Sequence, residues 1–271
     1  MLTRHDEYRQ RETGIPFHFN PRVERTDLLR SAESNWHEDI ELQLCLEGEG
    51  YIMLDSERFP FCAGDIVAIG SNVIHYTGTD SRIVYDCLIT DAAFCRESGL
   101  EPAALRFGGC FKSEEVQTIW KALRKTYETM DDPCRIAKLR LECLRLFILL
   151  KEKHTVVTPF VPTQNSTLDL AKRAIVYIRE HAAEPLTLER IAASLLVDKY
   201  TLARLFKRAT GESVFDYVIG FRCKQAQALI ADGMRVSEAA YRAGFSNMSY
   251  FTKTFKKRTG KLPSEFKPKC K

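Results

Sequence analysis

This sequence lacks any long apolar run. Its densest one, from Leu146 to Leu150, is far shorter than the roughly 20 residues that a membrane-spanning helix needs. The N-terminus also lacks an apolar leader, because charged side chains begin at Arg4. We therefore expect a cytoplasmic protein that makes no contact with a membrane.

Paired cysteines are missing as well, although the chain contains nine Cys. No two of them form a CxxC motif, and they are scattered from Cys45 to Cys270. Such spacing argues against a thiolate zinc site and against the disulfide framework of a small secreted domain. We expect most of these side chains to be buried thiols, and we expect no cofactor and no metal ion.

Charge is unevenly distributed along the chain, behind a net charge of +4. From Leu168 to the C-terminus there are 20 Lys and Arg against 10 Asp and Glu, whereas residues 1–167 contain 20 against 26. A basic segment next to an acidic one is typical of a polyanion-binding module attached to a domain of another kind. With 271 residues, the chain is long enough for two domains.

The first part of the chain shows the short, alternating pattern of β-strands. Residues 1–14 are polar and charged, and we expect an arm there. Between Ile15 and about Phe107, turn signals such as residues 48–50 (Gly-Glu-Gly) separate the apolar segments. Strands so closely spaced predict an antiparallel sandwich or a small barrel. The expected strands cover residues 40–46, 51–54, 59–61, 66–69 and 83–89.

Two helical patterns follow. The first begins at Ser113, a suitable N-cap because its hydroxyl can accept a backbone N–H, and acidic residues occupy its first turn. The second begins near Pro133 and carries two apolar rows at helical spacing. The first row consists of Ile136, Leu139, Cys143, Leu146 and Leu150, and the second consists of Ala137, Leu141, Leu144 and Ile148.

Two apolar rows on one helix allow two interpretations. In the first, one row packs against its own domain and the other against a helix of a second subunit. In the second, the helix is buried on both sides within one chain. We predict a homodimer in which the first row forms the contact. Residues 155–167, with two Pro and many polar side chains, are expected to be a linker.

The rest of the chain contains a duplicated motif. Residues 205–211 (LFKRATG) are repeated in similar form at residues 254–260 (TFKKRTG). Each copy predicts the end of a basic helix that a Gly terminates, and a shorter helical pattern precedes each. Two such pairs predict a duplicated helix-turn-helix. The expected helices cover residues 168–181, 187–195, 199–209, 214–230, 236–243 and 248–258, with a turn at 263–266. Suitable N-caps are Thr187, Asp198, Ser237 and Asn247.

These residues resemble the AraC/XylS family of transcription regulators. The run from Gly244 to Phe266, GFSNMSYFTKTFKKRTGKLPSEF, is similar to the second helix-turn-helix of that family. The first helix-turn-helix and the linking helix of the family are matched by Leu188, Ile191, Ala192, Leu195, Leu202, Leu205, Phe206, Lys207, Gly211, Tyr217 and Arg222. The resemblance implies a DNA-binding domain that carries both motifs.

The β-rich part resembles the cupin-like sensor domain common in this family. His37 and Glu41 match the first cupin motif, and His75 matches the second. Asn35 replaces the first His, so the usual metal-binding set of three His and one Glu is incomplete. Only His37, Glu41 and His75 remain as ligands, which would still be enough for a metal ion with open positions.

The resemblance implies a multidomain protein. An all-β cupin-like barrel with two dimerisation-type helices is followed by an all-α double helix-turn-helix domain. The predicted segments are an N-terminal arm at 1–14, an effector-binding domain at 15–110, a helical dimerisation segment at 111–154, a linker at 155–167 and the DNA-binding domain at 168–271.

Base contacts are expected near the start of the second helix of each motif, because that helix lies in the major groove with its N-terminal residues at the base edges. The resemblance places Arg204 at such a position, where it can pair bidentately with guanine. Basic residues further along each helix are expected to hold phosphates. The predicted DNA-binding residues are Lys199, Tyr200, Thr201, Ala203, Arg204, Lys207, Arg208, Asn247, Met248, Ser249, Lys253, Lys256 and Lys257.

We interpret the chain as a sequence-specific DNA-binding regulator, and not as an enzyme. Its expected partners are double-stranded promoter DNA, a small-molecule effector, RNA polymerase and a second copy of the chain. The resemblance implies activation as the usual mode and a sugar or related carbon source as the commonest effector. The side chains suited to stacking on it or binding its hydroxyls are His18, Trp36, His37, Glu41, Tyr51 and His75.

Two alternatives stay open. The first is a metal-dependent cupin enzyme fused to a DNA-binding module, which requires His37, Glu41 and His75 to converge on a metal ion. The second is a DNA-binding protein whose β-domain only dimerises and senses nothing.

Overall fold

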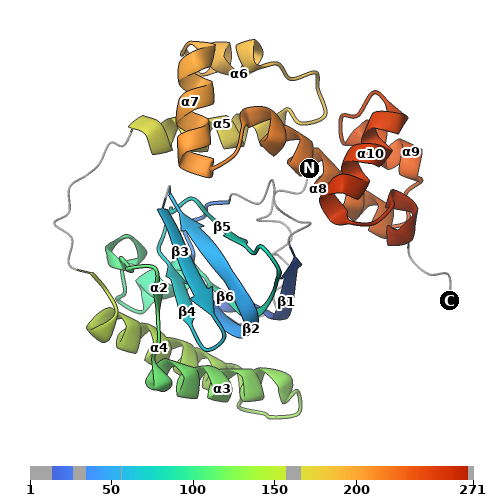
Figure 1. The fold of residues 1–271 in the computed structure, drawn as a ribbon. Helices are drawn as coiled ribbons and strands as arrows, with labels where there is room; N and C mark the ends of the chain where they lie inside the picture. The colour runs from blue at the N-terminus through green and yellow to red at the C-terminus, as the bar shows by residue number, and fades with distance from the viewer. Residues whose placement is uncertain (1–13, 27–34, 56, 157–165, 268–271) are drawn as a thin grey trace.

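The computed structural model describes residues 14–26, 35–55, 57–156 and 166–267. A β-rich part comes first and a helical part follows it (Figure 1). Of the predicted arm at residues 1–14 only Gly14 is described, and Cys270 and most of the predicted linker at residues 155–167 also lie outside the described residues. None of the helices described is both long and apolar enough to cross a membrane.

An antiparallel sheet forms the centre of the first part, as the closely spaced strands predicted. The main strand order is β1-β6-β2-β4-β7, and β3 and β5 also pair with β2. The pairings described are all antiparallel. The strands are β1 (Phe17–Thr26), β2 (Ile40–Leu54), β3 (Glu57–Cys62), β4 (Ile66–Ile69), β5 (His75–Gly78), β6 (Arg82–Thr90) and β7 (Cys110–Phe111).

Strand β2 corrects one prediction, because residues 48–50 do not form a turn. The strand runs through them, and its register against β6 shifts between Cys45 and Glu47. Gly48 has a left-handed φ of 78°, a conformation that glycine adopts without strain. The bulge and the glycine bend the strand. Its first half pairs with β4 and β6, and its second half pairs with β3 and β5.

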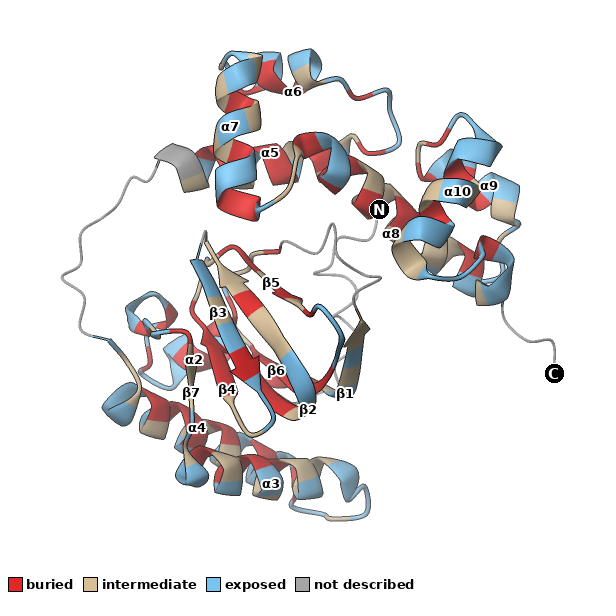
Figure 2. Cartoon of the chain, viewed as in Figure 1, coloured by how far each residue is buried: buried red, intermediate tan, exposed pale blue. Residues whose placement is uncertain are grey.

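Alternation along β2 places its side chains in two environments. Ile40 and Leu42 belong to an apolar core that the sheet shares with helices α3 (Glu114–Glu128) and α4 (Arg135–Lys153). The residue between them, Glu41, points to the other side of the sheet and is buried there. Figure 2 shows the buried residues of α3 and α4 on the sides that face the sheet. Ser113 caps α3 as predicted, by accepting a hydrogen bond from the backbone N–H of Val116 at 3.3 Å.

The predicted dimer contact on α4 is wrong for four of its five residues. These four are completely buried in the core beneath the sheet, and only Ile136 of the row is exposed. Three of the four residues in the second row face outward instead, with Leu141 55% and Ile148 48% exposed. The fourth, Leu144, is partly buried against the same core. Both rows are apolar at the same spacing, so periodicity alone could not tell which one faces the sheet. The buried residues are Leu139, Cys143, Leu146 and Leu150.

The helical part contains the two predicted helix-turn-helix pairs, α6–α7 and α9–α10, with α8 between them (Figure 1). Each pair has its own core, and α8 contributes Tyr217 to the first and Ala226 to the second. The helices are α5 (Ser166–Glu180), α6 (Leu188–Ser194), α7 (Lys199–Thr210), α8 (Val214–Ala231), α9 (Val236–Arg242), α10 (Met248–Thr259) and the 3-10 helix η3 (Pro263–Phe266).

Predicted caps hold at three of the four helix starts. Thr187 accepts a hydrogen bond from the backbone N–H of Arg190 at 3.1 Å, and the caps of α7 and α10 are described below. Ser237 is not a cap, because α9 begins one residue before it and Arg235 occupies the cap position without a side-chain hydrogen bond. Two short helices in the first part were not predicted, namely α2 (Ala92–Glu97) and η2 (Pro102–Ala104).

Candidate DNA-binding helices and effector pocket

Helix α7 presents the first set of predicted DNA-binding residues. Asp198 caps it by accepting a hydrogen bond from the backbone N–H of Thr201 at 2.9 Å, and hydrogen bonding to Thr201 holds the pKa of this carboxyl below its ordinary value. Phe206 is buried and therefore sets which face points outward. On the opposite face Tyr200 is 75% exposed and Arg204 is exposed as well. Both side chains are free to meet a duplex.

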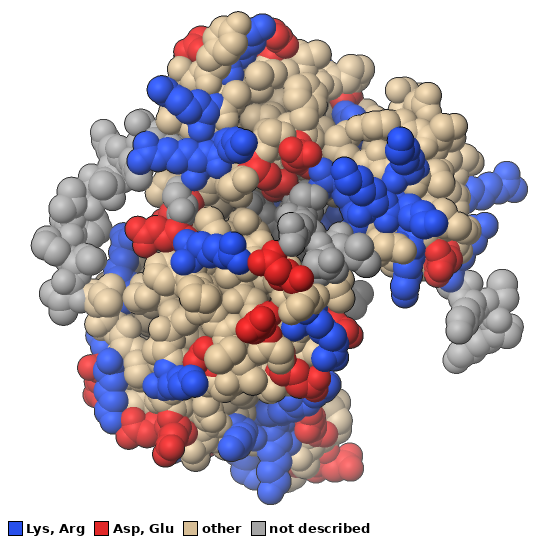
Figure 3. All heavy atoms as spheres, in the orientation of Figure 1, with Lys and Arg blue, Asp and Glu red and all other residues tan. Residues whose placement is uncertain are grey.

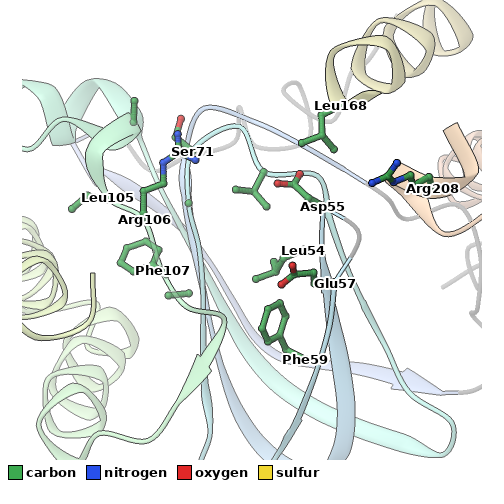
Figure 4. A pocket seen from close by; sticks show the side chains of 14 residues that line it. Leu54, Asp55, Glu57, Phe59, Ser71, Leu105, Arg106, Phe107, Leu168 and Arg208 are labelled. Carbon is green, nitrogen blue, oxygen red and sulfur yellow. The ribbon is translucent and has the colours of Figure 1, made fainter. Parts of the chain in front are cut away.

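Two members of the predicted set on α7 are engaged elsewhere. Lys199 donates from Nζ to a carboxylate oxygen of Glu189 on α6 at 2.7 Å. Arg208 lines a cavity together with residues of the β-rich part (Figure 4). The structure therefore does not group Arg208 with the DNA-facing residues. Lys207, one position earlier, is exposed.

Helix α10 repeats the construction of α7. Asn247 caps it by accepting a hydrogen bond from the backbone N–H of Tyr250 at 2.9 Å, and Gly260 ends it with a left-handed φ of 73°. Gly211 ends α7 in the same way, with a φ of 80°. Lys257 is exposed. An open hollow on the outer side of α10 is lined by Met248, Ser249, Thr252, Lys253, Lys256 and Leu262, four of which are predicted DNA-binding residues.

Helix α8 fixes the two motifs to each other. Arg222 donates from Nε to the carbonyl of Ala182 at 2.8 Å and from Nη2 to the carbonyl of Glu184 at 2.7 Å. Arg179 on α5 donates from Nε to the hydroxyl of Tyr217 at 3.0 Å.

Figure 3 shows Lys and Arg side chains gathered over α8 and α10 in this view. The motifs therefore form one unit with a basic surface, which suits a polyanion.

A cavity of about 390 Å³ lies where the β-rich part meets the helical part. Figure 4 shows Leu168 and Arg208, both from the helical part, on the side of Asp55. Charged groups of both signs line it, because Glu57 and Arg106 also contribute. The other lining residues are Leu54, Phe59, Ala68, Gly70, Ser71, Val73, Ala103, Leu105 and Phe107. No local pattern in the sequence indicated this cavity, since its walls come from segments far apart in the chain.

Asp55 is an acid of this cavity whose pKa is perturbed. Burial raises the pKa of its carboxyl above the ordinary value, and the backbone N–H of Ile74, which donates to Oδ1 at 3.0 Å, only partly opposes this effect. The residue also has a left-handed φ of 54°, which costs backbone strain for a non-glycine residue. Its position at the end of β2 aims a polar group at the boundary between the two parts.

Three of the predicted effector residues meet inside the β-rich part. Nε2 of His37 and Nε2 of His75 each lie 3.2 Å from Oε2 of Glu41. The other carboxylate oxygen, Oε1, accepts from Nε2 of Gln43 at 2.7 Å and from Sγ of Cys87 at 3.4 Å. Burial alone would raise the pKa of Glu41, but attraction to His75 and hydrogen bonding with both imidazoles lower it well below its ordinary value.

The other three predicted effector residues lie apart from this cluster. His18 Nε2 lies 2.8 Å from Oδ1 of its neighbour Asn20. The guanidinium of Arg58 on β3 lies 3.8 Å from the centre of the Tyr51 ring. Both side chains lie on the face of the β2–β3 ladder opposite the buried Ile52. Trp36 packs against the core of the first helix-turn-helix. The structure therefore does not bring these three residues into one site.

Two cations on α5 connect the helical part to the β-rich part. Lys172 donates from Nζ to the carbonyl of Asn72 at 2.5 Å, and its ammonium lies 5.4 Å from the centre of the Trp36 ring. Arg179 donates from Nη2 to Oδ1 of Asn35 at 3.0 Å. Since Arg179 also binds α8, one side chain links the β-rich part to the helix that carries both motifs.

Two family models match this chain. The model described as the AraC-like ligand-binding domain matches residues 24–146, and a helix-turn-helix domain model matches residues 191–269. The arabinose operon regulatory protein of Salmonella typhimurium is 25% identical over 237 residues, which cover 84% of this chain and 83% of that protein. An uncharacterized HTH-type transcriptional regulator of Pseudoalteromonas carrageenovora is 33% identical over 98 residues, which are 36% of this chain and 58% of that regulator.

A solved structure supports the fold. Wild-type ToxT from Vibrio cholerae with a bound unsaturated fatty acid superimposes with a TM-score of 0.52 and 14% sequence identity, covering 95% of this chain and 96% of that one. At this identity the likeness concerns the two-domain architecture. The matched domains and the named regulators show that the chain belongs to the AraC family of transcriptional regulators, with a ligand-binding domain, a helix-turn-helix DNA-binding domain and effector-responsive regulation.

Proposed function

We propose that α7 and α10 are the two recognition helices and that they enter successive major-groove faces of one promoter site. The observation that carries this proposal is their matched construction. Each has a side-chain cap at its start and a left-handed glycine at its end. Arg204 and Lys253 are exposed on the two helices and are the base-reading residues. Because α8 holds both motifs, the two contacts should be about 34 Å apart along the duplex.

Phosphate contacts belong to Lys207, Lys256 and Lys257. All three are exposed, and they lie further along the recognition helices than the base-reading residues. A lysine that neutralises a phosphate adds affinity and salt dependence, and adds no choice of sequence. These residues therefore account for the strength of binding, while Arg204 and Lys253 account for its specificity.

The effector site is the cavity between the two parts. A ligand in it would touch Asp55, Glu57 and Arg208 on one side and Arg106 on the other. Such a ligand binds the two domain arrangements with different affinity and therefore shifts their populations. Carboxylates and guanidinium groups suit the hydroxyls of a sugar or a related polar molecule, and the Salmonella relative is named for the arabinose operon. The cluster of His37, Glu41 and His75 is a separate feature.

The outward row of α4 provides the dimer contact in this proposal. Leu141 and Ile148 are large apolar side chains that are about half exposed, and Ala137 lies on the same side of the helix. Pairing this row with a second copy would bury it. The dimer would then activate transcription by contacting RNA polymerase next to its site.

Selection of duplexes from a random DNA library tests the DNA-reading proposal. The full-length protein should enrich a site with two conserved elements whose centres are about one helical turn apart. Repeating the selection with Lys253→Ala should relax one element and leave the other unchanged. A single element, or equal relaxation of both, would reject the assignment of α10. A thermal-shift screen of the wild-type protein with sugars and organic acids then searches for the effector.

A further inference from the structure

We propose that His37, Glu41 and His75 bind a divalent transition-metal ion. This site is distinct from the DNA-reading helices and from the cavity between the domains, and so the inference goes beyond the proposed function. From the sequence we expected no metal ion, because Asn35 replaces one ligand of the usual set. The three remaining ligand atoms nevertheless lie within 4.8 Å of one another, and all three residues are buried.

The outer nitrogens of the two imidazoles determine what the inner ones can do. Nδ1 of His37 lies 3.0 Å from the carbonyl oxygen of Asp39, and Nδ1 of His75 lies 2.9 Å from the carbonyl oxygen of Val73. A carbonyl oxygen only accepts hydrogen bonds, so each Nδ1 must carry a proton. In the neutral ring, Nε2 then offers a lone pair. Two lone pairs and a carboxylate therefore converge on one point.

The two imidazole rings lie on either side of this point, with their centres 5.1 Å apart in a buried place. A metal ion held there would accept both lone pairs and the carboxylate oxygen at once. Backbone carbonyls that hold Nδ1–H are also the usual outer partners of metal-binding histidines.

The distances from the two imidazoles to the carboxylate also fit a shared metal ion. Two ligands about 2.1 Å from a metal ion are about 3.0 to 3.4 Å apart when the angle between them is octahedral or tetrahedral. Both Nε2 atoms lie 3.2 Å from Oε2 of Glu41. Gln43 and Cys87 hold the other oxygen of this carboxylate, so its orientation is fixed before any ion binds.

The donor set selects the class of metal. Two imidazoles suit Zn²⁺, Fe²⁺, Co²⁺ or Ni²⁺ better than Mg²⁺ or Ca²⁺, and the absence of a thiolate among the three ligands disfavours Cu⁺. Three protein ligands leave positions open for water or another small ligand.

The site lies next to the contact with the DNA-binding domain. The backbone of Asn35 pairs with that of His75 through two hydrogen bonds of 2.9 and 2.8 Å. The side chain of Asn35 accepts from Arg179 of α5. An ion on His37 and His75 therefore stabilises the segment on which the DNA-binding domain rests.

Titration of metal-stripped, full-length protein with Co²⁺ tests the proposal, by calorimetry and by absorption spectroscopy. We expect one ion per chain and ligand-field bands without a thiolate charge-transfer band. His37→Gln combined with His75→Gln should weaken binding more than about 100-fold, and Glu41→Gln alone should also weaken it strongly. His154→Gln is the matched control, because this imidazole stacks on Phe111 away from the cluster, and it should bind Co²⁺ like the wild type.

Three outcomes would overturn the proposal. They are no stoichiometric binding by the wild type, equal binding by the double variant, or a thiolate band that assigns the ion to cysteines. Circular dichroism and binding to the selected DNA confirm that each variant is folded. Because DNA selection needs no metal titration, a failure of this site would leave the DNA-reading proposal intact, and the reverse also holds.

Discussion

In the proposed mode of DNA binding, base specificity depends most directly on Arg204. It is exposed on the outward face of α7, and its guanidinium fork can bind guanine bidentately. Arg204→Ala should cost about 1 to 3 kcal/mol at the selected site and relax the preference for one base pair. Fluorescence anisotropy with single-base variants of the site measures both effects. An equal loss on all sequences would show that Arg204 binds the backbone.

Lys207 provides the contrast, because it is exposed further along the same helix. Lys207→Ala should weaken binding to all duplexes alike and reduce the slope of log affinity against log salt concentration by about 1. Affinities measured over a series of salt concentrations give this slope. If the slope stays at the wild-type value, Lys207 makes no phosphate contact.

Asp55 gives the protein a predictable dependence on pH. Burial raises its pKa in the folded state, so ionising this carboxyl opposes folding. The cost is absent below the ordinary value of 3.8 and complete above the folded-state pKa. Asp55→Asn keeps the oxygen that accepts from Ile74 and removes the charge. The variant should therefore have the higher Tm at neutral pH, by a margin that shrinks on acidification. A margin that does not vary with pH would contradict this explanation.

At the scale of elements, the outward row of α4 leads to a prediction about self-association. Leu141→Glu combined with Ile148→Glu places two charges on the outward row and should weaken self-association about tenfold or more. Light scattering after gel filtration measures the oligomeric state. Met130→Glu is the control, because Met130 is an exposed apolar residue outside the row, and it should leave association unchanged. A double variant that associates like the wild type would remove α4 from the interface.

The elements also show which features can be predicted from sequence. The caps Asp198 and Asn247 and the C-terminal glycines act within one helical turn, so the ends of α7 and α10 followed from local residues. The bend in β2 did not, because Gly48 is compatible with both a turn and a bulge. The dimer row failed for a similar reason. Which row of α4 faces the sheet depends on its packing against distant strands.

Of the candidate sites, one could also be predicted from the sequence and one could not. His37, Glu41 and His75 could be found from their motif spacing, although only the structure showed that backbone carbonyls orient both imidazoles. The cavity between the domains could not be found, because Asp55 and Arg208 are separated by most of the chain. Arg208 resembled a phosphate contact for the same reason, since its sequence neighbours are basic and its partners are distant.

At the scale of the whole molecule, the contact between the domains provides a route for regulation. Arg179 donates to Asn35 in the sensor domain and to Tyr217 in α8. A ligand that moves the sensor domain would therefore act on the helix that holds both reading motifs. This coupling needs no long chain of residues, because the side chain touches both sides.

The central claim is that α7 and α10 read DNA together as one unit. Hydroxyl-radical footprinting of the full-length protein on its selected site tests it most directly. We predict two protected stretches on one side of the duplex, with centres about one helical turn apart, and loss of protection at the first stretch with Arg204→Ala. A single protected stretch, or two whose spacing varies between bound molecules, would contradict the claim.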